Sequence, residues 1–324
     1  MQIRTTTMRV ALSLLGIATA APAFAQDYPE RTIRFISPTA AGGGNDIFAR
    51  LSAQKLSEAF GKSVIVENRP GGGTIIGTEI VAKALADGHT IIMVTTNFII
   101  NPGLVPKLPY DSMKDLAPVA LLASAPLVLV LHPSIPAKTV GEFVALAKRR
   151  PGEINYASSG NGTAGHLAGV LMDATAGTKM THIPYKSTAP ALIDVLSGQV
   201  QMFFVSTPSV QQHLKSGKLR GLAVTSTARS SLLPELPTMA EAGVKGYDIA
   251  QIYGVLAPGG TPPAIVNRLN AVLTKALKSP DVIERLRNDG ADAVGGPPEQ
   301  FAQYIRTEIP KWIKVIRESG ARID

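Results

Sequence analysis

Residues 32–51, TIRFISPTAAGGGNDIFARL, contain the pattern that decides the fold. The β-branched run TIRFIS predicts a strand, and the three glycines after it, Gly42–Gly44, predict a turn. Asn45 is a good N-cap for the helix that the apolar spacing of Ile47 and Phe48 then predicts. A strand joined through a short turn to a helix is half of a βαβ unit, so this stretch predicts a parallel sheet covered by helices.

The same alternation continues on both sides of a long apolar stretch. Strands are predicted at SVIVEN and TIIMV before it, and at INYAS and VQMFFV after it, each followed by a helical pattern. Two such series favour two similar α/β domains over one large sheet. The chain ends in helices from Pro262 onward, which predicts a return to the first domain. We expect residues 26–125 and 255–324 to form domain 1 and residues 126–254 to form domain 2.

Composition narrows the class of protein. The chain has 324 residues, enough for about two domains, and 45% of them are hydrophobic, which excludes a mainly disordered chain. It has no cysteine, so disulfides, thiolate metal sites and a cysteine nucleophile are excluded. The apolar stretch Leu116–Leu131 is interrupted by Pro118 and Pro126 and ends in PLVLVL, which is typical of a buried strand rather than of a membrane span.

The first 25 residues predict a cleaved export signal. Arg4 and Arg9 form a positive start, Val10–Ala20 is apolar, and Ala23-Phe24-Ala25 is a small-x-small cleavage site. The apolar run is too short for a spanning helix, which needs ~20 residues. Cleavage after Ala25 and a periplasmic location are therefore expected.

The net charge of the chain says little about its binding partners. Loss of the signal lowers the formal net charge from +8 to +6, which suits small anions but is equally typical of a soluble surface. The densest basic cluster, Lys148-Arg149-Arg150, ends a helical pattern, where cations complement the helix dipole, and no aromatic residues are interleaved with it. A nucleic-acid partner is not expected.

Motifs for catalysis are missing from the sequence. It contains neither a G-x-S-x-G nucleophile elbow nor an H-E-x-x-H helix, and its five histidines lack metal-ligand spacing. The spacing Gly160-x-Gly162-x-x-Gly165 matches a dinucleotide fingerprint, but the stretch about 20 residues later, Thr181–Pro184, has no acid for the ribose. We expect a non-enzyme without a cofactor or metal.

Two glycine-bearing loops are the candidate binding site. One is Pro38–Asp46 (PTAAGGGND), the other is Ser158–His166 (SSGNGTAGH), and each lies between a predicted strand and a predicted helix. A helix N-terminus offers unpaired N–H groups and a partial positive charge, so it receives anions readily. Two such loops, one from each domain, could hold a ligand that carries two carboxylates; separately, each could be only a turn.

With these residues in view, the chain resembles the Bug/TctC-type proteins, the extracytoplasmic solute receptors of tripartite tricarboxylate transporters. The resemblance covers the mature chain in ordered segments that include VIVENRPGGGTIIGTEIVAKALADGHTI, INYASSGNGTAGHLAGVLM and LAPGGTPPAIVNRLN. It implies a type II periplasmic binding protein-like fold, with two α/β domains joined by a hinge and the ligand in the cleft. It also implies that both loops hold a ligand carboxylate, largely through backbone N–H groups.

The sequence departs from the family pattern at two places. Where the family commonly has Phe-Asp-Asn, this chain has Phe204-Val205-Ser206, so the acid that would meet a ligand ammonium group is absent. The serine-histidine often found after the third strand is replaced by residues around Asn97 and Phe98. Phe98 and Val205 either line an apolar pocket suited to an aliphatic or aromatic dicarboxylate, or face the core.

These inferences give one functional prediction. We expect a monomeric periplasmic protein that captures a di- or tricarboxylate and delivers it to membrane permease subunits of a tripartite tricarboxylate-type transporter. A sensor that docks on a membrane receptor, or a secreted enzyme on the same scaffold, are the alternatives. The expected ligand-binding residues are Thr39, Ala40, Ala41, Gly42, Gly43, Asn45, Asp46, Asn97, Ser158, Ser159, Gly160, Asn161, Gly162, Thr163, His166, Val205 and Ser206.

Overall fold

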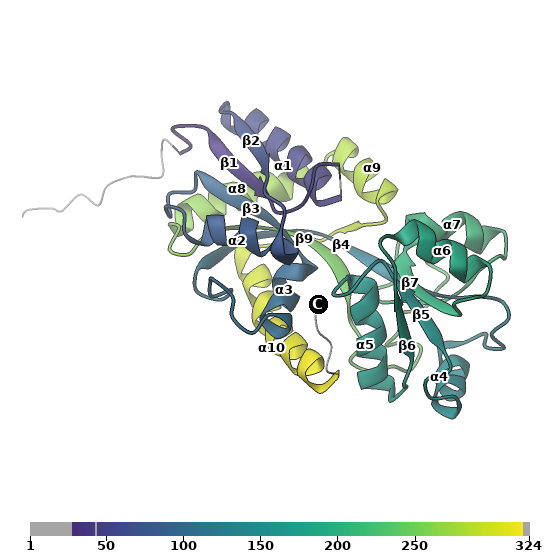
Figure 1. Ribbon diagram of the computed structural model, residues 1–324. Coiled ribbons are helices and arrows are strands. Elements are labelled where there is room, and N and C mark those ends of the chain that lie inside the picture. The colour runs from purple at the N-terminus through teal and green to yellow at the C-terminus, as the bar shows by residue number, and fades with distance from the viewer. Residues whose placement is uncertain (1–27, 43, 320–324) are drawn as a thin grey trace, which may run out of the picture.

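The structure, a computed structural model, describes residues 28–42 and 44–319. The predicted export signal and Gly43 lie outside these residues. Ten strands form one twisted sheet in the order β2-β1-β3-β9-β4-β7-β5-β6, with β8 and β10 also paired to β4 (Figure 1). The strands are β1 (Ile33–Ser37), β2 (Val64–Asn68), β3 (Thr90–Thr95), β4 (Leu116–Leu131), β5 (Asn155–Ser158), β6 (Thr181–Pro184), β7 (Met202–Ser206), β8 (Arg220–Val224), β9 (Ala250–Pro258) and β10 (Asp292–Ala293).

Helices follow the strands and cover both faces of the sheet (Figure 1). They are α1 (Gly44–Phe60), η1 (Gly72–Thr74), α2 (Ile75–Ala82), α3 (Thr96–Leu104), α4 (Val140–Arg149), α5 (Ala164–Ala176), α6 (Thr188–Leu196), α7 (Thr207–Lys215), α8 (Pro263–Ala276), α9 (Pro280–Asn288) and α10 (Pro298–Ser319). Within the described residues, none of these helices is long and apolar enough to cross a membrane.

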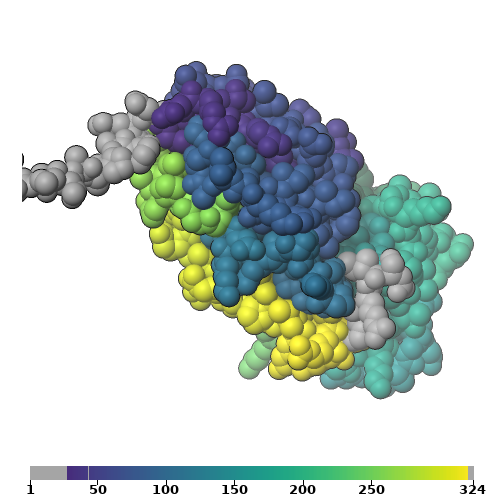
Figure 2. Space-filling model, turned by 60° about the vertical axis from the view of Figure 1, so that its left-hand side comes forward, coloured from purple at the N-terminus to yellow at the C-terminus, as the bar shows by residue number. Residues whose placement is uncertain are grey.

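The sheet divides into two lobes at β4. We call the part built on β1, β2, β3, β9 and the first two-thirds of β4 lobe 1, and the part built on β5, β6, β7, β8 and the end of β4 lobe 2. Up to Pro126, which lies opposite Ala250, β4 pairs with β9, and from Leu127 onward it pairs with β7. One strand therefore runs through both lobes. Figure 1 shows the elements of lobe 1 on the left and those of lobe 2 on the right, and in Figure 2 the teal residues of lobe 2 lie on the right, partly behind lobe 1.

Successive side chains along the strands of lobe 1 point to opposite faces of the sheet, so lobe 1 has a hydrophobic core on each face. Ile91 and Met93 of β3 pack toward α1, α8 and α9, whereas Ile92 and Val94 pack toward α2, α3 and α10. Successive strand side chains point to opposite faces, and both faces are covered by helices, so these strands read as continuous apolar runs. The α/β type II fold predicted from the sequence is confirmed, with both lobes built from strand–helix units.

Two expectations about individual segments were incomplete. The tail is not purely helical, because Asp292–Ala293 adds a short strand beside Ser124 and Ala123 of β4. The prolines do not end β4: Pro118 falls at a shift in register, and Pro126 falls where the strand changes partners. Both are places where the missing N–H of proline disrupts the ladder least.

The predicted domain boundaries remain a prediction, and the pairing of β9 bears on the second of them. All of β9 pairs with lobe 1 strands, and Tyr253 already lies opposite Thr95 of β3. The pairing therefore marks the return to lobe 1 at Ala250 rather than at residue 255. The first change of partner, at Leu127, lies one residue from the predicted start of domain 2.

Candidate functional site

A cavity of about 370 Å³ lies between the two lobes, where the strands of each lobe end. Residues of β4 and β9 form part of its wall, and residues from both lobes complete it. In open α/β sheets, ligands bind outside the carboxyl ends of the strands. We call this cavity the cleft.

Five helices begin at the cleft. Its lining includes Gly44, the first residue of α1, Asn97 near the start of α3, and Thr163 and Ala164 at the start of α5. Thr188 begins α6, and Ser206 is the N-cap of α7. The first N–H groups of a helix have no partner within the helix, and its N-terminus carries a partial positive charge of about half a unit. The cleft is therefore suited to an anion.

The rest of the cleft wall is largely apolar. Ala125 and Leu127 of β4 and Phe203–Val205 of β7 contribute to the lining, and Gln251 of β9 adds an amide. Phe98 is buried in the core of lobe 1 with Ile36 and Val94, so the core-facing alternative holds for Phe98. Val205 borders the cleft but is only 3% exposed and also packs in the core of lobe 2 with Val128 and Val210, so a ligand contact for its side chain remains a prediction. A ligand here would meet apolar surface between the helix N-termini.

Among the residues that the structure describes, Asp289 is the only charged side chain in the cleft lining. Arg285 donates two hydrogen bonds to its carboxylate, from Nε at 2.7 Å and Nη2 at 3.1 Å, so the acid already has a cationic partner. Burial, helped by the nearby Asp289 charge, raises the pKa of Tyr253 to about 12, so this phenol is a neutral hydrogen-bond donor at physiological pH. Within residues 28–42 and 44–319, no lysine or arginine lines the cleft.

Two polar side chains at the end of the first loop bind neighbouring parts of lobe 1 and do not line the cleft. Asp46 is buried and accepts hydrogen bonds from Gly42 N–H at 2.9 Å, Arg50 Nε at 3.0 Å and Asn68 Nδ2 at 2.8 Å. Burial raises the pKa of Asp46, but these hydrogen bonds together outweigh it and hold the pKa below its usual value. Asn45 lies within 3.4 Å of Ser37 Oγ. Both residues therefore fix the loop at the start of α1.

The second loop is held by a network of its own. Thr163 Oγ1 donates to Gly160 O at 2.7 Å, and Gly160 N–H donates to Ser158 Oγ at 3.1 Å. Gly162 N–H donates to Nδ1 of His166 at 3.0 Å, and His166 lies beside a different cavity, behind the loop. Glycine is needed at position 162, where φ is 72°.

The structure separates the expected site residues into two groups. Asn97, Ser159, Thr163, Val205 and Ser206 line the cleft. The others with a described position do not line it: Thr39, Ala40, Ala41, Gly42, Asn45, Asp46, Ser158, Gly160, Asn161, Gly162 and His166. Of these, Ala40, Ala41, Gly42 and Asn161 are exposed on the loops, and a direct ligand contact for any residue of either group remains a prediction.

Several lining residues were missed from the sequence. Thr188 follows a strand and begins a helix, which is the same signal that identified the two loops, so it could have been found. Tyr253 and Gln251 carry no local signal, because only the return of β9 into lobe 1 brings them to the cleft. A Cβ added at Gly44 would lie 2.9 Å from the Tyr253 hydroxyl, so this glycine permits a close approach of helix and ring.

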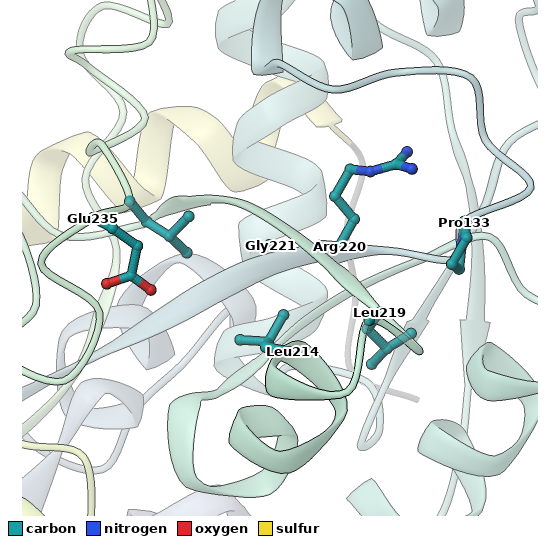
Figure 3. Close-up of a pocket in the computed structure, with 8 residues that line it drawn as sticks. Pro133, Leu214, Leu219, Arg220, Gly221 and Glu235 are labelled. Atoms are coloured by element: carbon teal, nitrogen blue, oxygen red, sulfur yellow. The ribbon is translucent and has the colours of Figure 1, made fainter.

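A second cavity, of about 410 Å³, lies within lobe 2 and is shown in Figure 3. Leu214, Leu219 and Pro133 form much of its wall. Its one cation, Arg220, donates to the carbonyl oxygens of Ile135 and Ala137 at 3.1 and 2.9 Å. This cavity involves one lobe and no helix N-terminus, so it lacks the features that mark the cleft for an anion.

Comparison with known proteins identifies the family. The profile described as "Tripartite tricarboxylate transporter family receptor" (TctC) matches residues 48–321. The chain belongs to this family. Protein BugT of Bordetella pertussis is 38% identical to this TctC-family chain over 319 residues, which cover 96% of the chain and 98% of BugT.

Two solved structures of similar proteins contain carboxylates. Rpa4515 of R. palustris, with adipate, is 37% identical and superposes with a TM-score of 0.73, over 92% of this TctC-family chain and all of that one. MatC (Rpa3494) of Rhodopseudomonas palustris, with bound malate, is 32% identical with a TM-score of 0.71, over 89% of this chain and all of that one. The neighbours are solute-binding proteins, and the family consists of periplasmic receptors for carboxylates.

Proposed function

We propose that this TctC-family protein captures an aliphatic or aromatic dicarboxylate without an amino group and delivers it to the membrane subunits of a tripartite tricarboxylate-type transporter. The observation that carries the proposal is the convergence of five helix N-termini on one cleft, whose described lining contains no lysine or arginine. N–H groups and hydroxyls from both lobes supply donors for two carboxylates. The proteins solved with adipate and malate support this class of ligand.

The absence of an amino group follows from the acids available. A ligand ammonium group needs an unpaired carboxylate, and the only acid in the cleft lining, Asp289, is bonded at both oxygens to Arg285. Val205 stands where the family commonly places an acid. An ammonium group here would lose its hydration without gaining a charged partner, which is unfavourable. Aspartate and glutamate are therefore poor ligands in this proposal.

Capture without turnover is part of the proposal. The protein acts as a monomer after export and cleavage behind Ala25, and the two lobes close on the ligand about the segments where β4 leaves lobe 1 and β9 returns to it. The loops Pro38–Asp46 and Ser158–His166 then approach from opposite lobes. A permease, rather than a sensor kinase or other receptor, is the proposed recipient because the matched family is one of transporter receptors.

Calorimetry on residues 26–324 tests the proposal. The panel is adipate, malate, succinate, phthalate, citrate, aspartate and glutamate. We expect at least one dicarboxylate without an amine to bind, and to stabilise the fold by about 2.7 kcal/mol at 100 times its dissociation constant. Binding of only aspartate or glutamate would contradict the amine-free assignment. Disappearance of a bound dicarboxylate with formation of a product would contradict capture without turnover.

A further inference from the structure

Two histidines lie directly behind the second loop. The rings of His166, on α5, and His182, on β6, stack with centroids 4.0 Å apart and planes 15° apart. Tyr156 of β5 stacks on His182 at 4.9 Å, and its hydroxyl donates to His166 O at 3.3 Å. The sequence showed no reason to pair the two histidines, because β6 reaches α5 only in the folded lobe.

Each histidine contacts one end of the loop. Gly162 N–H donates to Nδ1 of His166 at 3.0 Å, which requires Nδ1 to be unprotonated. Nε2 of His182 lies 2.6 Å from Ser158 Oγ. Ser158 Oγ also lies 3.0 Å from Gly160 O, but Ser158 has only one proton to donate. Because Gly160 O already accepts the Thr163 hydroxyl at 2.7 Å, we assign the Ser158 proton to the shorter contact, with Nε2 of His182 as the acceptor.

We infer that His166 and His182 are positioning residues for the segment Ser158–Thr163, and that they hold it in its binding shape only while both rings are unprotonated. Protonation of His166 at Nδ1 removes the acceptor of the Gly162 N–H group. Protonation of His182 at Nε2 makes this nitrogen a donor to Ser158 Oγ. The Ser158 hydroxyl must then donate to Gly160 O, which already accepts the Thr163 hydroxyl. In both cases the loop loses a contact that sets the direction of its N–H groups. The effect on ligand binding rests on the proposed function.

The surroundings keep the pair neutral at pH 7. Burial lowers the pKa of His166, and burial together with the nearby His166 lowers the pKa of His182 to about 4. The charged groups that share the cavity behind His166 are Asp173 of α5, Lys179 before β6 and Glu318 of α10. Asp173 is occupied by Thr178 Oγ1 at 2.6 Å and Met180 N–H at 3.2 Å, and burial raises its pKa. The phenol of Tyr247 donates to Ala168 O and has its pKa raised by burial.

The test uses variants that keep an acceptor but cannot titrate. In His166→Asn the amide oxygen can take the place of Nδ1, and in His182→Gln the amide can take the place of Nε2. His166→Leu removes the acceptor. His213→Gln, on α7 away from the loop, is the control for replacing a histidine elsewhere in lobe 2. Circular dichroism checks that each variant is folded at every pH used.

Two readouts are measured between pH 7 and pH 4. One is the exchange protection of the Gly160 and Gly162 amides by NMR in the free protein, and the other is the dissociation constant for adipate. In the wild type and in His213→Gln, protection should fall by about tenfold per pH unit as the pH is lowered from 6.5, the ordinary pKa of histidine, toward the lowered pKa values of the pair, and adipate affinity should fall with it. The double variant H166N/H182Q should keep wild-type protection at pH 7 within about threefold and lose the pH dependence. His166→Leu should lose at least tenfold in protection at pH 7.

Each contrary result has a definite meaning. An unchanged pH profile in H166N/H182Q, or full Gly162 protection in His166→Leu, would overturn the inference. Adipate itself titrates in this pH range whichever variant it binds, so comparing H166N/H182Q with the wild type removes the contribution of adipate to the change in affinity. Failure of the wild type to bind adipate would count against that ligand, and the exchange measurement would still decide whether the histidine pair positions the loop.

Discussion

In the proposed function, Val205 is the residue that most directly sets the chemistry of the cleft. It lies at the carboxyl end of β7, is 3% exposed, and lines the cavity beside Ser206. In Val205→Asp a carboxylate would face the dicarboxylate, so we expect at least a tenfold loss of affinity for adipate or malate and a gain for aspartate and glutamate. A tenfold change in affinity corresponds to about 1.4 kcal/mol, which the repulsion between two like charges in a partly dehydrated site readily supplies. Calorimetry with all four ligands measures this.

Val205→Asn is the matched control, because asparagine has the shape and polarity of aspartate without its charge. It should lose less affinity for dicarboxylates than Val205→Asp and gain none for amino acids. Equal behaviour of the two variants would mean that shape, not charge, governs this position.

Gly162 tests the second loop at the same scale. Its φ of 72° is in the left-handed region, where a side chain costs roughly 1–2 kcal/mol, and more when it is β-branched. Gly162→Val should therefore shift the Gly162 N–H group away from His166 and abolish detectable dicarboxylate binding. Gly217→Val is the control, because Gly217 has φ of 70°, open space around it, and a place far from the cleft lining. We expect the two variants to lose a similar amount of stability, and only Gly162→Val to lose dicarboxylate binding. Binding by both variants would refute the role of the loop.

At the scale of elements, the sequence predicted what is local and missed what is tertiary. The helices α1 and α5 were foreseen because glycine turns and apolar spacing identify a strand–turn–helix unit within about 20 residues. Asp46 was expected at the ligand, and its ion pair with Arg50, four residues later on α1, is local. Its second partner, Asn68, is known only once β2 is paired beside β1. The same reason hid Tyr253 and Asp289, which enter the cleft through the return of the chain to lobe 1.

The end of β8 gives the prediction that belongs to this scale. Thr225, directly after β8 and fully buried, accepts from Leu127 N–H through Oγ1 at 2.9 Å, at the point where β4 enters lobe 2. Thr225→Val keeps the shape but leaves this buried N–H without a partner, so we expect a loss of about 1–3 kcal/mol in the free energy of unfolding. Urea denaturation measures it. Thr181→Val, which removes an exposed hydroxyl bonded to Gly152 O, should cost less than about 0.5 kcal/mol, and equal costs would show that the buried contact at the crossing is unimportant.

At the scale of the whole molecule, the two lobes should close on a bound ligand. The wall of the cleft is shared between lobes whose backbones continue into each other at Leu127 and Ala250, so a ligand held by helix N-termini of both lobes favours the closed arrangement over the open one. Ile76 of α2 in lobe 1 and Ile193 of α6 in lobe 2 are 49% and 66% exposed. Because the chain has no cysteine, the double variant Ile76→Cys/Ile193→Cys takes spin labels at these two positions alone.

Pulsed electron paramagnetic resonance on that pair should give a shorter or narrower distance distribution when a bound dicarboxylate is added. The matched pair Ile76→Cys/Met113→Cys lies within lobe 1, where Met113 is 45% exposed, and its distance should not change. A change within lobe 1 would mean that the ligand remodels the lobe instead of moving one lobe against the other. An unchanged distance across the cleft, with ligand demonstrably bound, would mean that the site is already formed in the free protein, and that a recipient in the membrane must recognise the loaded form by the ligand or the loops rather than by closure.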